Sequence, residues 1–505
     1  RPMEGPARVR LHDLLAGLDV LELIGGDVDV TSVTNDSRRV RPGSIYACIP
    51  GSHVDGHDFA EDAVHAGARA LLVQRRLELP GAAGDVAQAR VPLVRAALGP
   101  AASALFGHPS RAMRCLGVTG TNGKTTTTFL LEAITRAAGL RTGVIGTVGA
   151  RVDGIAVRTP QITPTTPEAP DLQQLLAEMR DAGVAAVAME VTSHGLARHE
   201  VDGTTFAAVC FTNLSHEHLD YHGTLHAYRE AKARLFDGSF APAAAVNVDD
   251  DTGRDLARRV VSAGGRLVSF GLAPDARVSA DTVVYDTHGT SFLLIDREDE
   301  TSVAVRTPLV GPFNLSNALA AAATANAAGL GADAIVAGLS SCPPVPGRME
   351  HVERGQPFTV LVDYAHTPDA LRNVLDAARA LAGKRRVVAV FGAGGDRDRE
   401  KRPLMGAAVG IAADVAVLTS DNPRTEPPDA IAAAVLAGLD GGSATVVVEL
   451  DRRAAIRAAL ADAAPGDVVV IAGKGHETGQ TIGDQTRPFD DRVVASEELE
   501  ALGWT

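Results

Sequence analysis

The sequence has few aromatic residues and few cysteines. Aromatic residues make up only 4% of its 505 residues, and the four cysteines stand at positions 48, 115, 210 and 342. Cysteines this sparse and this widely spaced are not typical of a disulfide framework or of a thiolate metal site. We therefore expect a protein of a reducing compartment and predict a cytoplasmic location.

An excess of positive charge is also absent. Lys and Arg number 48 against 62 for Asp and Glu, so the formal net charge is −14. Such a chain has no long-range positive field to gather nucleic acid or anionic lipid. We expect no nucleic-acid partner, and any anion that the protein binds must be met by a local group of side chains.

Long hydrophobic runs are missing as well. The longest weakly apolar stretch, 319–330, is mostly alanine and carries Asn326. It falls short of the roughly 20 strongly apolar residues that a membrane span needs. Residues 1–10 lack the apolar core of a signal peptide. These absences predict a soluble protein without a membrane partner.

The chain does contain alternating strand-like and helix-like segments. A length of 505 residues suggests about three domains, and 45% hydrophobic residues is typical of packed cores. Short apolar runs alternate with alanine-rich helical stretches, which indicates βαβ units and parallel sheets. We predict an α/β protein of three domains, with breaks near His108-Pro109-Ser110 and the proline-rich run 342–347. The predicted ranges are an α/β N-terminal domain (1–109), a central domain with a parallel sheet (110–344) and a Rossmann-like C-terminal domain (345–505).

In the third segment, four predicted strands are each followed by polar or glycine-rich residues. Loops that leave the carboxyl ends of parallel strands open onto one edge of the sheet, where ligands of open α/β folds bind. We therefore expect these four loops to converge on one crevice. The strands are 358–362, 387–391, 415–418 and 468–471, and the loops are 363–366, 392–399, 420–424 and 473–477.

The strand predicted over 113–119 leads into a phosphate-binding pattern, Gly120 to Thr126. A strand, a glycine-rich turn and a helix N-terminus present backbone N–H groups and a positive dipole end to a phosphate chain. Lys124 would then reach the terminal phosphates, and Thr125 would ligate Mg²⁺. The spacing departs from the common pattern, because Val118 stands where the first glycine is usual. The alternative is a turn with an incidental Gly-Lys pair.

Two other patterns are rejected. Residues 216–222 resemble a zinc-protease helix, but Asp220 stands where the second metal-binding histidine is needed. Gly392 to Gly395 follow a predicted strand, as the glycine-rich fingerprint of a dinucleotide-binding site does. The acidic side chains within 396–399 would then face the pyrophosphate, so nicotinamide binding is rejected.

Polar side chains also end two strands of the central segment. Glu190 closes an apolar strand and resembles the strand-end acid that holds Mg²⁺ opposite a phosphate loop. A solvated loop glutamate is the alternative. Asn213 and His218 follow the strand that ends at Phe211, so they are expected at the same edge.

Several further motifs occur in a fixed order along the chain. Together with the phosphate loop they resemble the ordered motif set of the Mur ligase family, and the resemblance spans residues from about 30 to 490. Within that family, Asp421 to Arg424 resembles the signature that recognises diaminopimelate. The motifs are 120–126, 190–194, 211–222, 228–232, 314–318, 347–350, 363–368 and 473–477.

The resemblance implies an ATP-dependent amide ligase of peptidoglycan precursor synthesis. Its domains would be an N-terminal UDP-sugar-binding domain (1–109), a central ATP-binding domain of the P-loop-type ATPase fold (110–344) and a C-terminal amino-acid-binding domain (345–505). The expected substrates are ATP, UDP-N-acetylmuramoyl-L-alanyl-D-glutamate and meso-diaminopimelate, with Mg²⁺ as the cofactor. The D-glutamyl γ-carboxylate would attack the γ-phosphate to form an acyl phosphate, which the amine of diaminopimelate displaces. The resemblance also implies domain closure around the ligands, since water would otherwise hydrolyse the acyl phosphate. We expect a monomer.

The resemblance assigns catalytic, metal and ATP-binding residues. It implies that Lys124, Lys232, Glu190 and His218 are catalytic, and that Lys232 is carbamylated. The expected metal ligands are Thr125, Glu190, His218 and carbamylated Lys232. The expected ATP-binding residues are Gly120, Thr121, Asn122, Gly123, Lys124, Thr125, Thr126, Asn317, Arg348 and Asp363.

Arginine presents a planar fork that can hold a carboxylate by two hydrogen bonds, and diaminopimelate carries one carboxylate more than lysine does. Arg424 is expected to supply that fork. A lysine-adding relative would lack this arginine, and a surface ion pair is the other reading of Arg424. By resemblance, the diaminopimelate-binding residues are Arg397, Asp421, Asn422, Pro423, Arg424, Gly473 and Glu477.

The nucleotide sugar is expected in the first segment and at its border with the second. One departure concerns Glu200, which stands where relatives place an arginine, and Arg198 is the candidate to replace that charge. Glu217 also occupies a position usually filled by Asp. The expected contacts with the UDP-linked dipeptide are Asn35, Ser37, His53, Val54, Asp55, Thr165, Thr166, Thr192, Arg198 and Glu200.

Two other functions remain open from the sequence. Folylpolyglutamate synthesis shares the phosphate loop and the region of Lys232, but the Asp421 to Arg424 loop and the first segment argue against it. The other is a non-catalytic module whose domains close on ATP.

Overall fold

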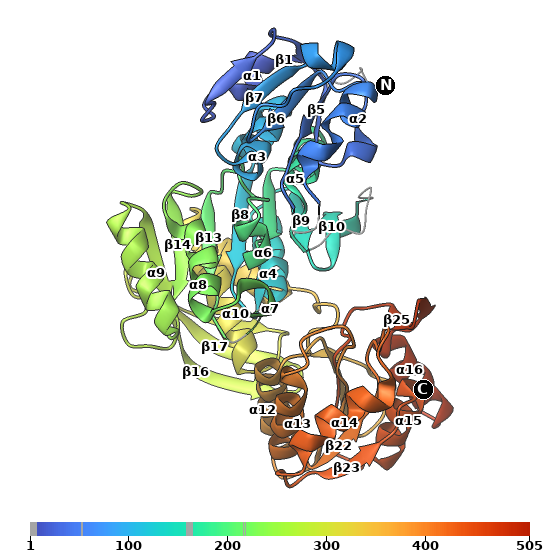
Figure 1. Cartoon of the computed structure of the whole chain (residues 1–505). Helices are drawn as coiled ribbons and strands as arrows, with labels where there is room; N and C mark the ends of the chain where they lie inside the picture. The colour runs from blue at the N-terminus through green and yellow to red at the C-terminus, as the bar shows by residue number, and fades with distance from the viewer. Residues whose placement is uncertain (1–7, 52–53, 158–164, 216, 218, 505) are drawn as a thin grey trace.

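The computed structural model describes residues 8–51, 54–157, 165–215, 217 and 219–504. The chain forms three α/β regions in a row, from the blue N-terminal region to the red C-terminal region of Figure 1. Each region is built on its own principal sheet. The expected three-part α/β fold class is confirmed, while the predicted boundaries at 109/110 and 344/345 remain a prediction. Among the described residues, no helix has both the length and the apolarity that a membrane crossing requires.

The N-terminal region contains a five-stranded sheet in the order β2-β7-β6-β5-β4. Its core is formed where the helices α1 and α3 pack against the sheet. The strands are β2 (Glu22–Ile24), β4 (Ser32–Thr34), β5 (Ser44–Ala47), β6 (Ala70–Val73) and β7 (Ala87–Arg90), and β1 (Val9–Arg10) pairs separately with β3 (Asp29–Val30). The helices are α1 (Leu11–Leu15), α2 (Ala60–His65) and α3 (Val94–Leu105).

The central region contains an eleven-stranded sheet in the order β11-β10-β9-β12-β8-β13-β14-β15-β16-β17-β18. The strands from β9 to β16 in that order run parallel, as predicted for this region, but β10, β11, β17 and β18 are antiparallel additions. The strands are β8 (Arg114–Thr119), β9 (Thr142–Gly146), β10 (Gly149–Val152), β11 (Ile155–Ala156), β12 (Ala186–Glu190), β13 (Ala208–Phe211), β14 (Ala243–Asn247), β15 (Arg266–Phe270), β16 (Val278–Asp286), β17 (Gly289–Asp296) and β18 (Thr301–Thr307).

Helices cover both faces of the central sheet. One hydrophobic cluster joins α4, α10 and α11 to one face, and a second joins α5 and α9 to the other. Burial on both faces explains why the parallel strands read as continuous apolar runs. The helices are α4 (Lys124–Ala137), α5 (Ala169–Asp181), α6 (Ser193–Ala197), α7 (Leu219–His222), α8 (Leu225–Ala233), α9 (Asp251–Ser262), α10 (Pro312–Ala327) and α11 (Ala332–Ser341).

The C-terminal region contains a six-stranded sheet in the order β19-β20-β24-β21-β22-β23. All its neighbouring strands run parallel except β19, which is antiparallel to β20. Helices α12, α13 and α14 pack on one face, and α15 and α16 on the other. The strands are β19 (Glu350–His351), β20 (Thr359–Asp363), β21 (Val387–Phe391), β22 (Val415–Leu418), β23 (Thr445–Val448) and β24 (Val468–Ala472), followed by the hairpin β25 (Gly479–Ile482) and β26 (Gln485–Pro488). The helices are α12 (Pro368–Ala382), α13 (Lys401–Ala412), α14 (Pro428–Leu439), α15 (Arg452–Asp462) and α16 (Asp491–Ala501).

Candidate functional site

The phosphate loop joins β8 to α4. Gly120 and Gly123 both have positive φ angles, +147° and +89°. A Cβ at Gly120 would lie 1.9 Å from Thr212 Oγ1, and one at Gly123 would lie 2.2 Å from Asn317 Oδ1. Only glycine fits these two positions, because the backbone conformation and the close neighbours both exclude a side chain. The loop therefore keeps its backbone open at the N-terminus of α4, as an anion site requires.

Lys124 is the first residue of α4 and folds back over the loop. Its Nζ donates hydrogen bonds to the carbonyl oxygens of Gly120 at 2.9 Å and Thr121 at 2.8 Å. Burial lowers the pKa of Lys124, while the charges of Glu217 and Glu190 oppose that effect. The ammonium group is thus held at the mouth of the loop, where a terminal phosphate would arrive.

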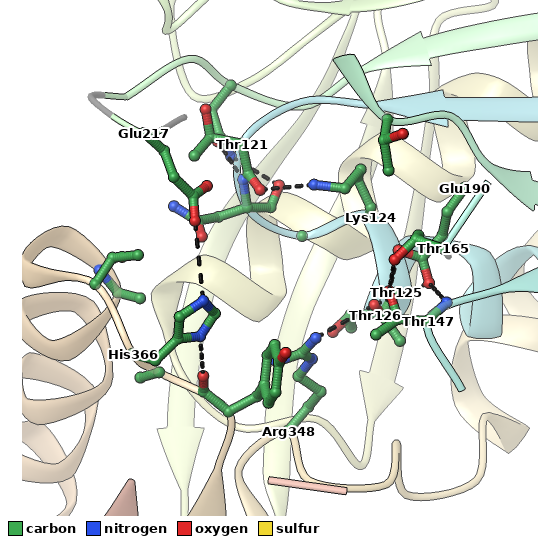
Figure 2. A pocket seen from close by; sticks show the side chains of 18 of the residues that line it. Thr121, Lys124, Thr125, Thr126, Thr147, Thr165, Glu190, Glu217, Arg348 and His366 are labelled. Carbon is green, nitrogen blue, oxygen red and sulfur yellow. Dashed lines mark hydrogen bonds and ion pairs between the residues drawn. The ribbon is translucent and has the colours of Figure 1, made fainter. Parts of the chain in front are cut away.

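Thr125 and Glu190 meet opposite this loop (Figure 2). The Thr125 hydroxyl donates to Glu190 Oε1 at 3.0 Å. Glu190 also accepts from the backbone N–H of Thr147 at 2.9 Å and from the Thr147 hydroxyl at 3.0 Å. Arg348 of the C-terminal region donates to Thr125 Oγ1 at 3.3 Å. The predicted strand-end acid therefore faces the phosphate loop.

Lys232 lies on α8 and is 1% exposed. Its Nζ donates to the Gly120 carbonyl at 2.9 Å and lies 4.4 Å from the centre of the Tyr228 ring. Burial lowers the pKa of Lys232 well below its ordinary value, and the charge of Lys124 lowers it further. Lys232 is therefore a buried lysine that contacts the phosphate loop, not a solvated surface residue.

These residues line a cavity of about 470 Å³ between the central and C-terminal regions. The predicted residues that line it are Thr121, Asn122, Gly123, Lys124, Thr125, Thr126, Thr165, Glu190, Thr192, Arg198, Glu200, Lys232, Asn317, Arg348 and Asp363. The carbonyl oxygen of Gly120 accepts hydrogen bonds from Lys124 and Lys232, which both line the cavity. His218 falls outside the described residues. Among the residues that are described, no group of three or more His, Cys, Asp and Glu could hold a metal ion.

The C-terminal region contributes the loop after β20 to this cavity. Asp363 is buried, and its carboxylate accepts from the backbone N–H groups of Met349 and Ala365, both at 2.8 Å. Burial raises the pKa of Asp363. The Arg348 guanidinium lies 4.5 Å from the centre of the Tyr364 ring. Asp363 therefore joins the segment carrying Arg348 to the end of β20.

A second cluster contains the residues predicted to bind diaminopimelate. Asn422 donates to Glu477 Oε2 at 2.9 Å, and Arg424 Nη1 donates to the Gly395 carbonyl at 2.6 Å. Arg424 has a φ of +53°, a left-handed conformation that costs a residue with a side chain about 1–2 kcal/mol. Its backbone N–H donates to the Thr481 carbonyl at 3.1 Å, so β25 holds this conformation in place. Three of the four loops predicted to share one crevice, those after β21, β22 and β24, meet here, whereas the loop after β20 lines the 470 Å³ cavity.

This second cluster does not line the 470 Å³ cavity. Tyr364 lines the cavity and contacts both parts: the Arg348 guanidinium lies 4.5 Å from the centre of its ring, and the ring of His476, next to Glu477, lies 5.1 Å from it. Pro423 is buried, while Arg397 is exposed. The structure therefore places the predicted amino-acid subsite next to Tyr364, which lines the cavity, but it does not join the phosphate subsite and the amino-acid subsite in one cavity.

The residues predicted to bind the nucleotide sugar divide into two groups. In the N-terminal region, Asn35 donates to Glu168 Oε2 at 3.4 Å, Ser37 begins a short 3₁₀ turn, and Val54 is exposed. The Asp55 carboxylate already accepts from His57 and Arg75. His53 lies outside the described residues.

The other group lies at the cavity. Thr165 contacts the Thr147 hydroxyl at 3.1 Å, and Thr166 contacts the Thr192 hydroxyl at 3.0 Å. Arg198 Nη1 lies 3.7 Å from Glu200 Oε1. Burial raises the pKa of Glu200 to about 7, and the charge of Glu168 adds to this while Arg198 opposes it. The two residues therefore form a pair in which only Arg198 is partly exposed.

Replacing Glu200 with Gln is expected to change how stability depends on pH. Because the pKa of about 7 lies above the ordinary 4.5, folding favours the protonated acid. Its contribution to stability is complete below pH 4.5 and is lost as the pH rises through 7. At pH 8 we expect Glu200→Gln to melt a few degrees above the wild type, and at pH 5 to melt close to it, by calorimetry. Glu61→Gln, at an exposed position, should change neither value. Equal melting temperatures at pH 8 would contradict this account.

Sequence reasoning missed several residues of the site. Thr147 holds Glu190 but lies in the turn after β9 without a motif of its own. Tyr364 and Lys474 stand inside motifs that were recognised, yet neither was given a role. Lys474 is fully buried and donates to Asn422 Oδ1 and Glu477 Oε2, both at 3.1 Å. A charged residue inside a recognised glycine-rich loop was the signal available for Lys474.

The strand, glycine-rich loop and helix, with a lysine and a threonine facing a strand-end carboxylate, define a P-loop nucleotide-binding protein of three α/β regions. Family models match three parts of the chain. They are described as Mur ligase family, catalytic domain (residues 29–105), Mur ligase middle domain (118–325) and Mur ligase, glutamate ligase domain (347–475). The chain belongs to the Mur ligase family.

Curated relatives are similar over nearly their whole length. A UDP-N-acetylmuramoyl-L-alanyl-D-glutamate–2,6-diaminopimelate ligase of Geobacillus thermodenitrificans is 44% identical over 93% of this chain and 95% of its own. One of the same name from Streptomyces coelicolor is 44% identical over 98% of both chains. The resemblance inferred from the motifs is thereby confirmed.

Solved structures agree on the fold. A structure of a protein with the same ligase name is 34% identical, covers 99% of this chain and 100% of its own, and has a TM-score of 0.70. MurF from Acinetobacter baumannii has a TM-score of 0.63 at 19% identity, covering 93% of this chain and 96% of its own, and supports the fold alone.

Proposed function

We propose that this protein is an ATP-dependent amide ligase of peptidoglycan precursor synthesis. It would join meso-diaminopimelate to the D-glutamyl γ-carboxylate of UDP-N-acetylmuramoyl-L-alanyl-D-glutamate, with ADP and phosphate as the other products. The observation that carries this proposal is that Lys124, Lys232, the Thr125–Glu190 pair and Arg348 of the C-terminal region line the same cavity. The names of the 44% identical relatives support the choice of substrates.

The chemistry requires an activated acid. A carboxylate resists attack by an amine in water, so it must first gain a leaving group, and phosphoryl transfer from ATP supplies one. Carboxylate and triphosphate are both anions, so the cations around them control the rate. Lys124 and Arg348 approach the cavity from opposite regions and would together neutralise charge on the transferring phosphoryl group.

The donor set fits Mg²⁺. The hydroxyl of Thr125 and the carboxylate of Glu190 are hard oxygen ligands and lie 3.0 Å apart. Carbamylated Lys232 would add further oxygens, and its low pKa favours the neutral amine that reacts with carbon dioxide. When bound, Mg²⁺ would stabilise negative charge on the triphosphate. Thr125, Glu190, His218 and Lys232 are the residues that we propose to hold it.

The D-glutamyl γ-carboxylate of the UDP-linked dipeptide would reach the phosphate loop from the side of the N-terminal region. Thr165 and Thr192 line the cavity on this side, Thr166 contacts the Thr192 hydroxyl behind them, and Arg198 offers a cation for an acceptor carboxylate. Buried Glu200 keeps that cation oriented through the 3.7 Å contact. Relatives carry an arginine at the position of Glu200. Arg198 would thus supply the positive charge that this arginine provides in them.

The amine would come from the second cluster. Arg424 and Arg397 would bind the distal carboxylate of diaminopimelate, and Asp421, Asn422 and Glu477 would bind its ammonium head. Since these residues lie behind Tyr364 rather than in the cavity, we expect the C-terminal region to move when ligands bind, which would exclude water from the acyl phosphate.

A phosphate-release assay tests the function. We expect release from ATP only when the UDP-linked dipeptide and diaminopimelate are both present, with a product mass equal to the two joined minus water. Release that depends on a folate substrate, or nucleotide binding with no turnover under any condition, would overturn the proposal.

Arg424→Ala tests the choice of amino acid. Losing a charged, bidentate partner should lower kcat/KM for diaminopimelate by about 10- to 100-fold. The kcat/KM for lysine, which lacks the second carboxylate, should change by less than about threefold. Arg487→Ala, at an exposed position on β26, is the control and should change neither. Equal losses for both amino acids would remove Arg424 from this role.

A further inference from the structure

A fully buried ion pair lies beneath the predicted amino-acid subsite. Arg452, the first residue of α15, and Asp491, the first residue of α16, both have fully buried side chains. Arg452 Nε donates to Asp491 Oδ1 at 2.8 Å, and Nη2 donates to Oδ2 at 2.6 Å. This bidentate pair joins two helices on the face of the sheet opposite α12, α13 and α14.

The same guanidinium also reaches two strand ends. Arg452 Nη1 donates to the Ser420 carbonyl at 3.3 Å, and Nη2 donates to the Ala472 carbonyl at 3.0 Å. Ser420 and Ala472 directly precede Asp421 and Gly473, which are two of the residues proposed to bind the amino acid. Arg452 is therefore bonded to the backbone of both loops at the point where each leaves its strand.

Gly473 lies close both to Asp421 and to the buried pair. A Cβ on Gly473 would lie 2.5 Å from Asp421 Oδ2 and 3.9 Å from Arg452 Nη2, and the Gly473 φ of +119° is open only to glycine. Burial raises the pKa of Asp421, while the charges of Arg452 and Lys474 oppose that effect. The absence of a side chain at Gly473 therefore leaves room for the Asp421 carboxylate, which experiences the positive charge of the Arg452 guanidinium.

Stability alone does not account for this pair. A cation at a helix N-terminus opposes the helix dipole, and a buried ion pair can often be replaced by apolar residues without loss of stability. Asp490 and Asp451 already cap the two helices by accepting backbone N–H bonds. What apolar residues could not reproduce is the pair of hydrogen bonds to the carbonyls of Ser420 and Ala472.

We propose that the buried Arg452–Asp491 pair positions the amino-acid subsite, by fixing the loops after β22 and β24 relative to each other. This inference rests on the proposed ligase function. Asp491 lies in the segment after residue 475, outside the part matched by the family models. The last helix of the chain therefore belongs to the amino-acid site although it is not expected to touch the substrate.

The test compares Arg452→Met with the double variant Arg452→Met/Asp491→Leu. We expect Arg452→Met to raise the KM for diaminopimelate by about tenfold or more, because loop misplacement weakens binding, and to leave the KM for ATP within about twofold. The double variant should regain melting temperature, since no unpaired charge stays buried, but keep the raised KM. The control is Arg453→Met, since Arg453 joins the same two helices through Glu497 and Glu498 at the surface. It should change no KM.

These measurements distinguish a role of the Arg452–Asp491 pair in positioning the amino-acid subsite from a role in stability alone. An unchanged KM for diaminopimelate in Arg452→Met, or a KM that returns to normal together with the melting temperature in the double variant, would overturn the inference. If Arg452→Met does not fold, the double variant decides by its KM alone. If neither folds, Arg452→Lys decides, because its single ammonium cannot span Asp491 and both carbonyls and should raise the same KM. Wild-type protein without diaminopimelate-dependent turnover would instead refute the proposed function.

Discussion

Lys124→Ala is expected to lower kcat by about 10³-fold or more. Lys124 is held by the Gly120 and Thr121 carbonyls at the mouth of the phosphate loop, where a triphosphate would take over those hydrogen bonds. Its charge would act chiefly on the phosphoryl group in transfer, so its loss should affect the transition state more than nucleotide binding. The measurement is steady-state phosphate release together with the dissociation constant for ATP, which should rise far less than kcat falls.

The control for this variant is Lys384→Ala, which removes an exposed lysine in the turn after α12. It should leave both kcat and ATP binding unchanged. If Lys124→Ala kept near-normal turnover, the phosphate loop would have no catalytic role. A loss of ATP binding as large as the loss of kcat would mean that Lys124 binds nucleotide without acting on the transition state.

Lys232→Ala is expected to abolish turnover, and excess bicarbonate should not restore it. The lysine is buried, its pKa is well below the ordinary value, and its Nζ lies 2.9 Å from the Gly120 carbonyl. We propose that the neutral amine takes up carbon dioxide and becomes an anionic ligand for Mg²⁺. In protein equilibrated with carbon-13 bicarbonate, a carbamate carbon signal should be present in the wild type and absent from Lys232→Ala.

A structural role for Lys232 would give a different result. Lys232→Met keeps much of the buried volume, so it should fold with a melting temperature near that of the wild type and still lack both turnover and the carbamate signal. Turnover at a normal rate in either variant would remove Lys232 from the metal site. Wild-type activity without any carbamate signal would leave the lysine catalytic but unmodified.

The local parts of the fold could be predicted from the sequence. The apolar run 387–391 is the buried strand β21, and it begins and ends at the predicted residues. The glycine-rich loop follows β8 and is itself followed by helix α4, which begins at Lys124. These features depend on patterns within a few residues. The antiparallel strands β17 and β18 were missed, because their exposed faces carry polar residues such as Ser302 and Arg306 and break the apolar runs.

The contacts of the site were harder to predict. Glu190 was identified as a strand-end acid, but its partner Thr147 stands 43 positions away. Arg452 and Asp491 are 39 positions apart, and neither lies in a motif. Both pairs exist only because strands and helices distant in sequence pack together, so no local pattern could indicate them. Arg424 was identified from its motif, yet its separation from the phosphate cavity depends on how the regions pack.

The central claim is that the acceptor carboxylate attacks the γ-phosphate within the cavity between the central and C-terminal regions. Labelling both oxygens of the D-glutamyl γ-carboxylate with oxygen-18 tests it directly. The account predicts that the phosphate released in the presence of diaminopimelate carries one labelled oxygen, because the acyl C–O bond breaks when the amine attacks. Released phosphate free of the label, with the amide product still formed, would contradict it.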